Sequence, residues 1–132
     1  MPIAVGVILA LAVGLLMTAL GFDRDRSFYP TVTIVIAFIY ALFAVMGGST
    51  SALLLESVVG VGFLVMAVLG FKSSLWLVAL ALVAHGVFDA VHGRIITNPG
   101  VPVFWPAFCA AYDVTAGAYL TWLIRTQRVR AR

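Results

Sequence analysis

Three ionisable side chains stand at helical spacing within an otherwise apolar segment of the chain: His85, Asp89 and His92. At 3.6 residues per turn, the fourth and seventh positions after His85 lie within about 40° of it around a helix, so the three side chains share one narrow face. Imidazole and carboxylate groups bind transition metals, and they also act as general acids and bases. The pattern therefore predicts a site for metal binding or proton transfer on one helix.

The composition places this helix in a membrane. Hydrophobic residues make up 64% of the 132 residues and charged residues only 10%, and the mean hydropathy is +1.16. Soluble domains are closer to half apolar and a quarter charged. Hydrocarbon solvates charge so poorly that an ionisable residue inside a membrane helix indicates a functional site.

Five apolar stretches predict an all-α fold, a compact bundle of five transmembrane helices that forms a single transmembrane domain over residues 1–132. The first stretch has no basic segment before it, so we expect a retained helix rather than a cleaved signal peptide. Pro30 and Pro106 each fall near the start of a stretch, where a missing N–H is tolerated. The expected spans are about 3–22, 28–46, 51–71, 73–91 and 103–124.

The basic residues predict the topology of the bundle. Seven of the eight fall on one side of a five-span protein, and only Arg94 falls on the other. Basic loops stay on the cytoplasmic side, so we expect a multi-pass protein of a bacterial inner (plasma) membrane with its N-terminus outside and its C-terminus cytoplasmic. This location explains the net charge of +3 without a nucleic-acid partner. The seven residues are Arg24, Arg26, Lys72, Arg125, Arg128, Arg130 and Arg132.

The ionisable residues inside the spans form one layer. With a rise of 1.5 Å per residue, His85 lies roughly 18 Å above the inner edge of the hydrocarbon, Asp89 roughly 24 Å, and His92 near the outer edge. On the same scale Glu56 lies roughly 22 Å and Asp113 roughly 15 Å above that edge. The third, fourth and fifth spans are therefore expected to build one site in the outer half of the bilayer.

This layer favours metal binding. Two imidazoles and three carboxylates match the ligands of zinc and iron, so the expected cofactor is a divalent transition metal. A metal-dependent enzyme would act on a small lipophilic or periplasmic substrate, with Glu56 and Asp89 as its catalytic carboxylates. The sequence leaves enzymatic activity itself open. The expected metal ligands are His85, Asp89, His92, Asp113 and Glu56.

Two other functions stay open. Chains of Asp, Glu and His carry protons through membranes, so the protein could be a proton- or cation-coupled transporter or channel. Such a path would have to cross the inner half of the membrane through hydroxyl groups, such as those of Tyr40 and Thr33, and water. A chain of this size is also typical of a non-catalytic subunit of a membrane assembly, or of a homo-oligomer.

Several of these residues also have a simpler structural interpretation. His92 can be read as an interfacial side chain, and Asp113 with Arg94 as an ion pair that fixes the helix register. Cys109 shares a helix face with Asp113 but is typical of a small apolar filler. The segment 97–100 has the residues of a turn, so the connection between the fourth and fifth spans is expected to be a plain connector.

Two family resemblances accompany these patterns. His85 and Asp89 resemble the HxxxE face of the sterol isomerase family, with Asp in place of Glu and Glu56 as the second carboxylate. That resemblance implies metal-free acid–base catalysis on a lipid-like substrate. Residues 26–30, the HxxxDxxH face and the WPxFCxxxD stretch (105–113) are similar to small five-span bacterial integral membrane proteins of unassigned function. The second resemblance implies the membrane fold and no activity.

Overall fold

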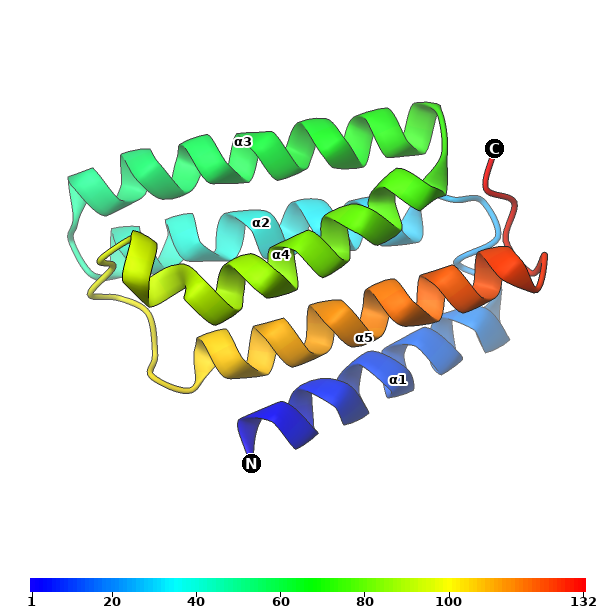
Figure 1. Ribbon diagram of the computed structural model, residues 1–132, viewed down its shortest axis with the longest axis horizontal. Coiled ribbons are helices and arrows are strands. Elements are labelled where there is room, and N and C mark those ends of the chain that lie inside the picture. Colours follow the sequence, from blue (N-terminus) through cyan, green and yellow to red (C-terminus); the bar gives the residue numbers. More distant parts are fainter.

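The computed structural model describes residues 1–132 and confirms the all-α fold. Five successive helices run in alternating directions along the bundle, so the neighbours α1 and α5 are parallel (Figure 1), and each helix is long and apolar enough to cross a membrane. Many large apolar side chains, such as Ile8, Leu15 and Val58, are exposed, as expected for a surface that faces lipid. The helices are α1 (Pro2–Leu20), α2 (Phe28–Met46), α3 (Thr50–Lys72), α4 (Leu75–Ile95) and α5 (Trp105–Arg125).

The helix ends follow local sequence signals. Gly21 closes α1 in the left-handed conformation, with φ of 81°, which glycine adopts without a steric penalty. The Ser49 side chain caps α3 by accepting a hydrogen bond from the Ala52 N–H. Helix α4 extends to Ile95, four residues beyond the expected 91, because its backbone bonding continues to the Ile96 N–H, which donates to the His92 carbonyl. His92 is therefore a helical residue.

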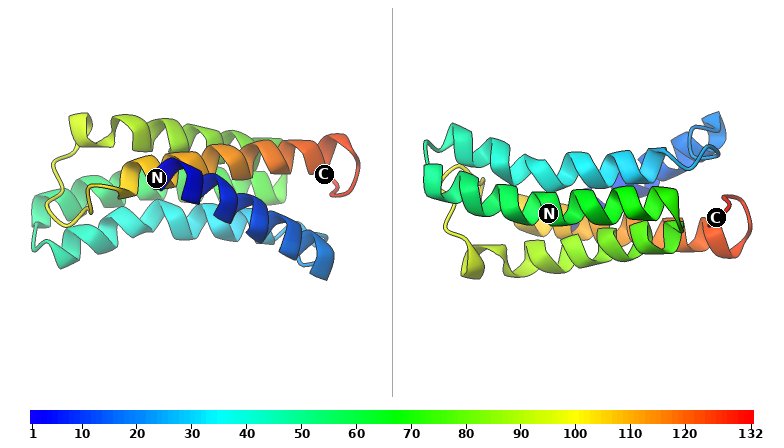
Figure 2. Two further views of the ribbon diagram at one scale, coloured as in Figure 1. Left: turned by 90° about the horizontal axis from the view of Figure 1, so that it is seen from below. Right: turned by 90° about the horizontal axis from the view of Figure 1, so that it is seen from above.

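The five helices form a bundle with α3 at one edge and α1 at the other (Figures 1 and 2). Helix α2 packs against α3, α4 against α5, and α3 against α4. Helix α1 packs mainly on α5, where glycines allow a close approach. A Cβ atom on Gly6 would lie 2.4 Å from the Phe108 carbonyl oxygen, and one on Gly14 would lie 2.9 Å from the Tyr119 ring.

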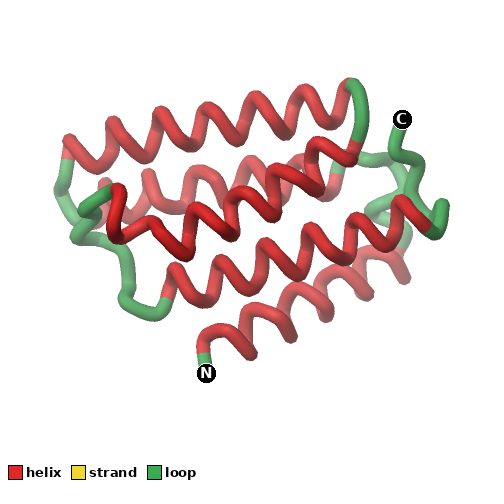
Figure 3. The backbone as a smooth tube through the Cα atoms, viewed as in Figure 1, coloured by secondary structure: helices red, strands yellow, loops and turns green.

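The basic residues gather at one end of the bundle. The Arg26 guanidinium donates hydrogen bonds to the carbonyls of Phe71 and Ala131, so it joins the α1–α2 connection, the end of α3 and the C-terminal tail. The Arg128 guanidinium lies 4.9 Å from the centre of the Trp122 ring. We call this the basic end. The α2–α3 and α4–α5 connections lie at the opposite end (Figure 3), which we call the connector end.

The interior divides into an apolar half and a polar half. A cluster of apolar side chains fills the half nearer the basic end, and the two histidines and every buried acidic residue except Asp23 occupy the other half. Counted along the helices, Glu56 lies about 9 Å from the connector end, Asp113 about 12 Å and His85 about 15 Å. The buried apolar residues include Ile36, Leu75, Val78, Leu82, Leu120, Leu123 and Ile124.

Candidate metal centre

Two facing helices build a group of four potential metal ligands. His85 and Asp89 stand four residues apart on α4, and Cys109 and Asp113 stand four residues apart on α5. Residues at this spacing lie one above the other on a helix face. The two pairs meet across the α4–α5 interface, where their ligand atoms all lie within 4.8 Å of one another and all four residues are buried.

Small residues bring the two helices this close. A Cβ atom on Gly86 would lie 3.0 Å from the Ala110 carbonyl oxygen, and one on Gly117 would lie 3.1 Å from the Ala79 carbonyl oxygen. The missing side chains let the α4 and α5 backbones approach closely beside the group and one helical turn farther toward the basic end. The short side chains of Asp and Cys can then reach ligands on the neighbouring helix.

Asp113 is the hub of the hydrogen bonds within the group. Its Oδ2 atom lies 2.6 Å from Nδ1 of His85, and the Cys109 thiol donates to the same oxygen over 3.8 Å. Asp89 Oδ2 lies 3.4 Å from the same His85 nitrogen. One ring nitrogen thus faces two carboxylates, and a single N–H cannot satisfy both.

Three of the four carboxylate oxygens of Asp89 and Asp113 have no hydrogen-bond partner. Both oxygens of Asp89 and Oδ1 of Asp113 are buried and form no hydrogen bond. Burying an ionised carboxylate without a partner costs on the order of several kcal/mol. Arg94 does not compensate it, because that residue is exposed and forms no salt bridge. The expected Arg94–Asp113 ion pair is therefore wrong, and no Lys or Arg side chain pairs with either carboxylate.

Glu56 and His92 form a separate pair rather than joining this group. Oε1 of Glu56 lies 2.7 Å from Nε2 of His92. The Asn98 side-chain amide donates to the same Glu56 oxygen over 3.0 Å and to the Tyr40 carbonyl over 3.0 Å. His92 is only 2% exposed, so its interpretation as an interfacial side chain is wrong.

Aromatic rings separate the two histidine–carboxylate pairs. Tyr40 stacks on His92, with ring centres 4.0 Å apart and an interplanar angle of 14°. Phe63 meets His85 edge-on at 4.8 Å, and Phe88 lies 6.0 Å from His85 and 5.4 Å from His92. The Tyr40 hydroxyl is also buried without a hydrogen-bond partner. These rings fix both imidazoles and keep the surroundings apolar.

The α4–α5 connection closes the site at the connector end. Asn98 ties it to α2 and α3 through the two hydrogen bonds described above. Gly100 packs so tightly on α2 that a Cβ atom there would lie 1.8 Å from the Phe43 carbonyl oxygen. Gly47 meets the same segment, since its Cβ atom would lie 2.5 Å from the Gly100 nitrogen. The connection, residues 96–104, is thus packed over the site rather than being the plain connector expected from the sequence. We call these residues the cover.

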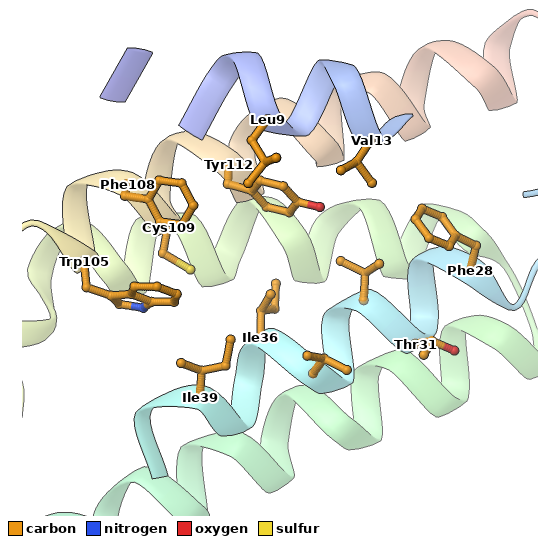
Figure 4. Close-up of a pocket in the computed structure, with 12 residues that line it drawn as sticks. Leu9, Val13, Phe28, Thr31, Ile36, Ile39, Trp105, Phe108, Cys109 and Tyr112 are labelled. Atoms are coloured by element: carbon orange, nitrogen blue, oxygen red, sulfur yellow. The ribbon is translucent and has the colours of Figure 1, made fainter. Parts of the chain in front are cut away.

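Two hollows reach the four-residue group from the surface of the bundle. An apolar cavity of about 360 Å³ lies between α1, α2 and α5, and Cys109 forms part of its wall (Figure 4). A larger groove of about 700 Å³ runs along α4 and α5, and Asp89 lies in its lining. The group is therefore approached from the sides of the bundle that face lipid.

Two residues of the site have larger roles than their sequence contexts predict. Cys109 was expected to be an apolar filler, yet its thiol lies within the ligand group; its spacing of four residues from Asp113 was the available signal. Asn98 was expected only to form a turn, yet its side chain holds Glu56. Nothing in the local sequence predicts that contact, because the two residues are 42 positions apart.

No protein-family model, curated protein or solved structure matches this chain.

Proposed function

We propose that the protein is a multi-pass membrane protein that binds one divalent transition-metal ion through His85, Asp89, Cys109 and Asp113. One observation carries the proposal: two facing pairs of ligand residues are buried together, while neither oxygen of Asp89 forms a hydrogen bond. A cation between the pairs would supply the positive charge that the buried carboxylates lack.

The donor atoms favour zinc, with iron as the alternative. Zinc binds sulfur at about 2.3 Å and nitrogen or oxygen at about 2.0–2.2 Å, so the ligand atoms of a tetrahedral site lie about 3.3–3.7 Å from one another. The four ligand atoms already lie within 4.8 Å of one another, and small side-chain rotations would close them on one ion. Sulfur and imidazole ligands disfavour magnesium and calcium, which prefer oxygen.

Chemistry at this metal requires a free coordination position. Four protein ligands fill a tetrahedral zinc site, and catalytic zinc sites keep one position for water or substrate. Asp89 is the ligand best placed to give up its position, because it lies in the lining of the groove along α4 and α5. We assign Asp89 this exchangeable role.

Glu56 has a different role in this proposal. It is bound by His92 and Asn98, and it would have to leave both to act on a substrate. Glu56 and His92 are better suited to holding the cover than to binding the metal or acting as catalysts. For the same reason, the pairing of Glu56 with His85 and Asp89 implied by the sterol isomerase resemblance finds no support in the contacts.

Proton or cation transport is less well supported. A conducting path would have to continue from His85 and Asp113 toward the basic end. Buried apolar side chains, among them Leu82 and Leu120, fill that half, and the Thr33 hydroxyl there donates to the Tyr29 carbonyl. The polar site is thus closed toward the basic end of the bundle.

The proposal also places the site in the outer half of the bilayer. The basic end carries seven of the eight basic residues, so we assign it to the cytoplasmic side and the connector end to the outside. We propose that this membrane is a bacterial inner membrane.

Elemental analysis of the protein purified in detergent tests the proposal, with His85→Ala as the test variant. His92→Ala is the matched control, because it removes the other buried histidine of the same helix. We expect one equivalent of zinc or iron in the wild type and in His92→Ala, and almost none in His85→Ala. A metal-free wild type after incubation with zinc, or a His85→Ala protein that keeps its metal, would contradict the proposal.

A further inference from the structure

A polar pocket of about 410 Å³ lies at the basic end of the bundle. Helices α1 and α5 pack together and finish at this same end (Figure 1). Arg24 lines the pocket from the α1–α2 connection, and Arg128 lines it from the segment that follows α5. The pocket shares no residue with the candidate metal centre. Its other lining residues are Thr18, Ala19 and Asp23.

A tight turn after α1 holds Arg24 at the pocket. Gly21 takes the left-handed conformation, and the Phe22 N–H donates to the Met17 carbonyl, so the chain reverses direction there. The Arg24 side chain folds back over this turn, because a Cβ atom on Gly21 would lie 3.3 Å from Nε of Arg24. The turn therefore places a guanidinium group beside the end of α1.

Arg128 is held just as firmly after α5. Its N–H donates to the Leu123 carbonyl over 2.9 Å, and the next residue, Val129, is buried in the apolar cluster. The Arg128 guanidinium lies 4.9 Å from the centre of the Trp122 ring, a distance typical of a cation–π contact. Arg128 thus lines the pocket from a fixed backbone position.

Neither arginine is paired with a carboxylate. All three salt bridges of the protein involve a histidine. The two acidic residues of this end have other partners: Asp25 accepts hydrogen bonds within its own turn, and Asp23 accepts one from the Thr18 hydroxyl over 2.6 Å. The donors of Arg24 and Arg128 match the oxygens of a phosphate group, which guanidinium groups bind in a bidentate manner.

The charges of the lining define the charge of the ligand. Arg24 and Arg128 each contribute one positive charge and Asp23 contributes one negative charge, so the lining has one positive charge in excess. Asp23 is only 2% exposed, which shields most of its carboxylate from the pocket. A phosphodiester carries a single negative charge and would neutralise this excess. Two like-charged guanidinium groups in one pocket repel each other, and an anion between them relieves that repulsion.

The surroundings of the pocket favour a lipid as the source of the phosphodiester. Large apolar side chains beside the α1 part of the lining are exposed, and they face acyl chains when the helix spans a membrane. Basic pockets between membrane helices on the cytoplasmic side bind anionic lipid headgroups, and the basic end is the side that we assign to the cytoplasm. The exposed side chains are Leu15, Leu16, Leu20 and Phe22.

We propose that Arg24 and Arg128 together bind the phosphodiester group of a membrane phospholipid. The phosphate lies between the two guanidinium groups, and the acyl chains lie along the exposed apolar side chains of α1. The bound lipid joins the α1–α2 connection to the segment after α5. This site goes beyond the proposed metal centre and does not depend on it.

Lipid binding to the detergent-purified protein, measured by native mass spectrometry, tests this proposal with two probes. Dioleoylphosphatidylglycerol has the phosphodiester, and dioleoylglycerol has the same acyl chains without it. One arginine beside an anionic headgroup corresponds to about fivefold in affinity. With two arginines, we expect the phospholipid to bind about 25-fold more tightly than dioleoylglycerol. Equal binding of the two probes would overturn the proposal.

Three arginine variants separate the pocket from a general attraction by the basic end. Arg24→Gln and Arg128→Gln should each weaken binding of the phospholipid about fivefold and leave binding of dioleoylglycerol unchanged. Arg132→Gln is the matched control, because it removes the same charge from the same end but lies outside the pocket; it should weaken binding less than twofold. Equal losses in all three variants would contradict a site built by Arg24 and Arg128.

A soluble probe distinguishes a lipid from a free phosphodiester. Glycerophosphoglycerol has the headgroup of the phospholipid without its acyl chains. We expect a 100-fold excess of this compound to leave most of the phospholipid bound, since it lacks the apolar contacts with α1. Displacement of the phospholipid by an equal concentration of glycerophosphoglycerol would contradict a lipid site.

Discussion

Nδ1 of His85 lies 2.6 Å from Oδ2 of Asp113 and joins α4 to α5 at the centre of the polar half. Both residues are at most 1% exposed, so this contact is shielded from water. In the proposed centre a metal ion would replace the proton of this hydrogen bond. Metal binding must therefore displace protons, and the affinity should fall as the pH is lowered.

In the metal-free protein, neutralising Asp89 should raise the thermal stability, whereas neutralising Asp113 should lower it. Asp89→Asn replaces a carboxylate that has no hydrogen bond, so it should raise the thermal stability of chelator-treated protein. Asp113→Asn weakens the bond to His85 and should lower the stability by about 1–3 kcal/mol. Thermal unfolding in detergent with excess chelator measures both changes. A fall in stability for both variants would mean that Asp89 has a partner in the metal-free protein.

With zinc added, the wild type should become more stable than Asp89→Asn. A ligand at 100 times its dissociation constant stabilises the folded state by about 2.7 kcal/mol, and Asp89→Asn should lose most of this gain because it lacks one metal ligand. The same unfolding measurement with added zinc provides the comparison. A zinc-induced gain equal to that of the wild type would remove Asp89 from the ligand set.

The cover should loosen when Glu56 is neutralised. Glu56→Gln keeps the shape of the side chain but weakens its bond to His92, at a cost of about 1.5–3 kcal/mol. We expect faster amide hydrogen exchange in residues 96–104, with metal content unchanged. Unchanged exchange would show that the segment is held without Glu56.

The docking of the cover also predicts a contrast between two glycines. Gly100→Ala would place a Cβ atom against the Phe43 carbonyl and should destabilise the protein by about 1–3 kcal/mol. Gly93→Ala is the control, because a Cβ atom there has no neighbour within 4 Å. Thermal unfolding compares the two, and similar stabilities would contradict the tight packing of this segment.

Much of the fold could be predicted from the sequence, because hydrophobic length determines which segments cross a membrane. The polar layer could also be predicted, since a rise of 1.5 Å per residue fixes depth along a helix. Which residues meet within that layer depends on how each helix is rotated and on its neighbours. Glu56 and Asp113 were expected in one site with His85, yet Glu56 bonds His92 and Asp113 bonds His85.

Cys109 is a second example of a contact that could not be predicted from the sequence. Its spacing from Asp113 placed both residues on one face, but only the α4–α5 packing shows that this face meets His85 and Asp89. The glycines at 86 and 117 set that packing through close backbone contacts. Such contacts between helices are not encoded in the periodicity of either helix alone.

The proposed orientation can be tested with single cysteines in intact cells. Thr97→Cys and Arg128→Cys place exposed thiols at the connector end and the basic end, whereas the native Cys109 is buried. A membrane-impermeant maleimide should label the first variant in intact cells and the second only after lysis. The reverse pattern would place the site in the cytoplasmic half.

X-ray absorption spectroscopy of the zinc-loaded protein tests the metal centre most directly. We expect one sulfur neighbour at about 2.3 Å together with nitrogen and oxygen neighbours at about 2.0–2.2 Å. Cys109→Ser should lose the sulfur signal and keep the lighter neighbours. A zinc ion with no sulfur neighbour in the wild type, or no bound zinc at all, would contradict a centre built from His85, Asp89, Cys109 and Asp113.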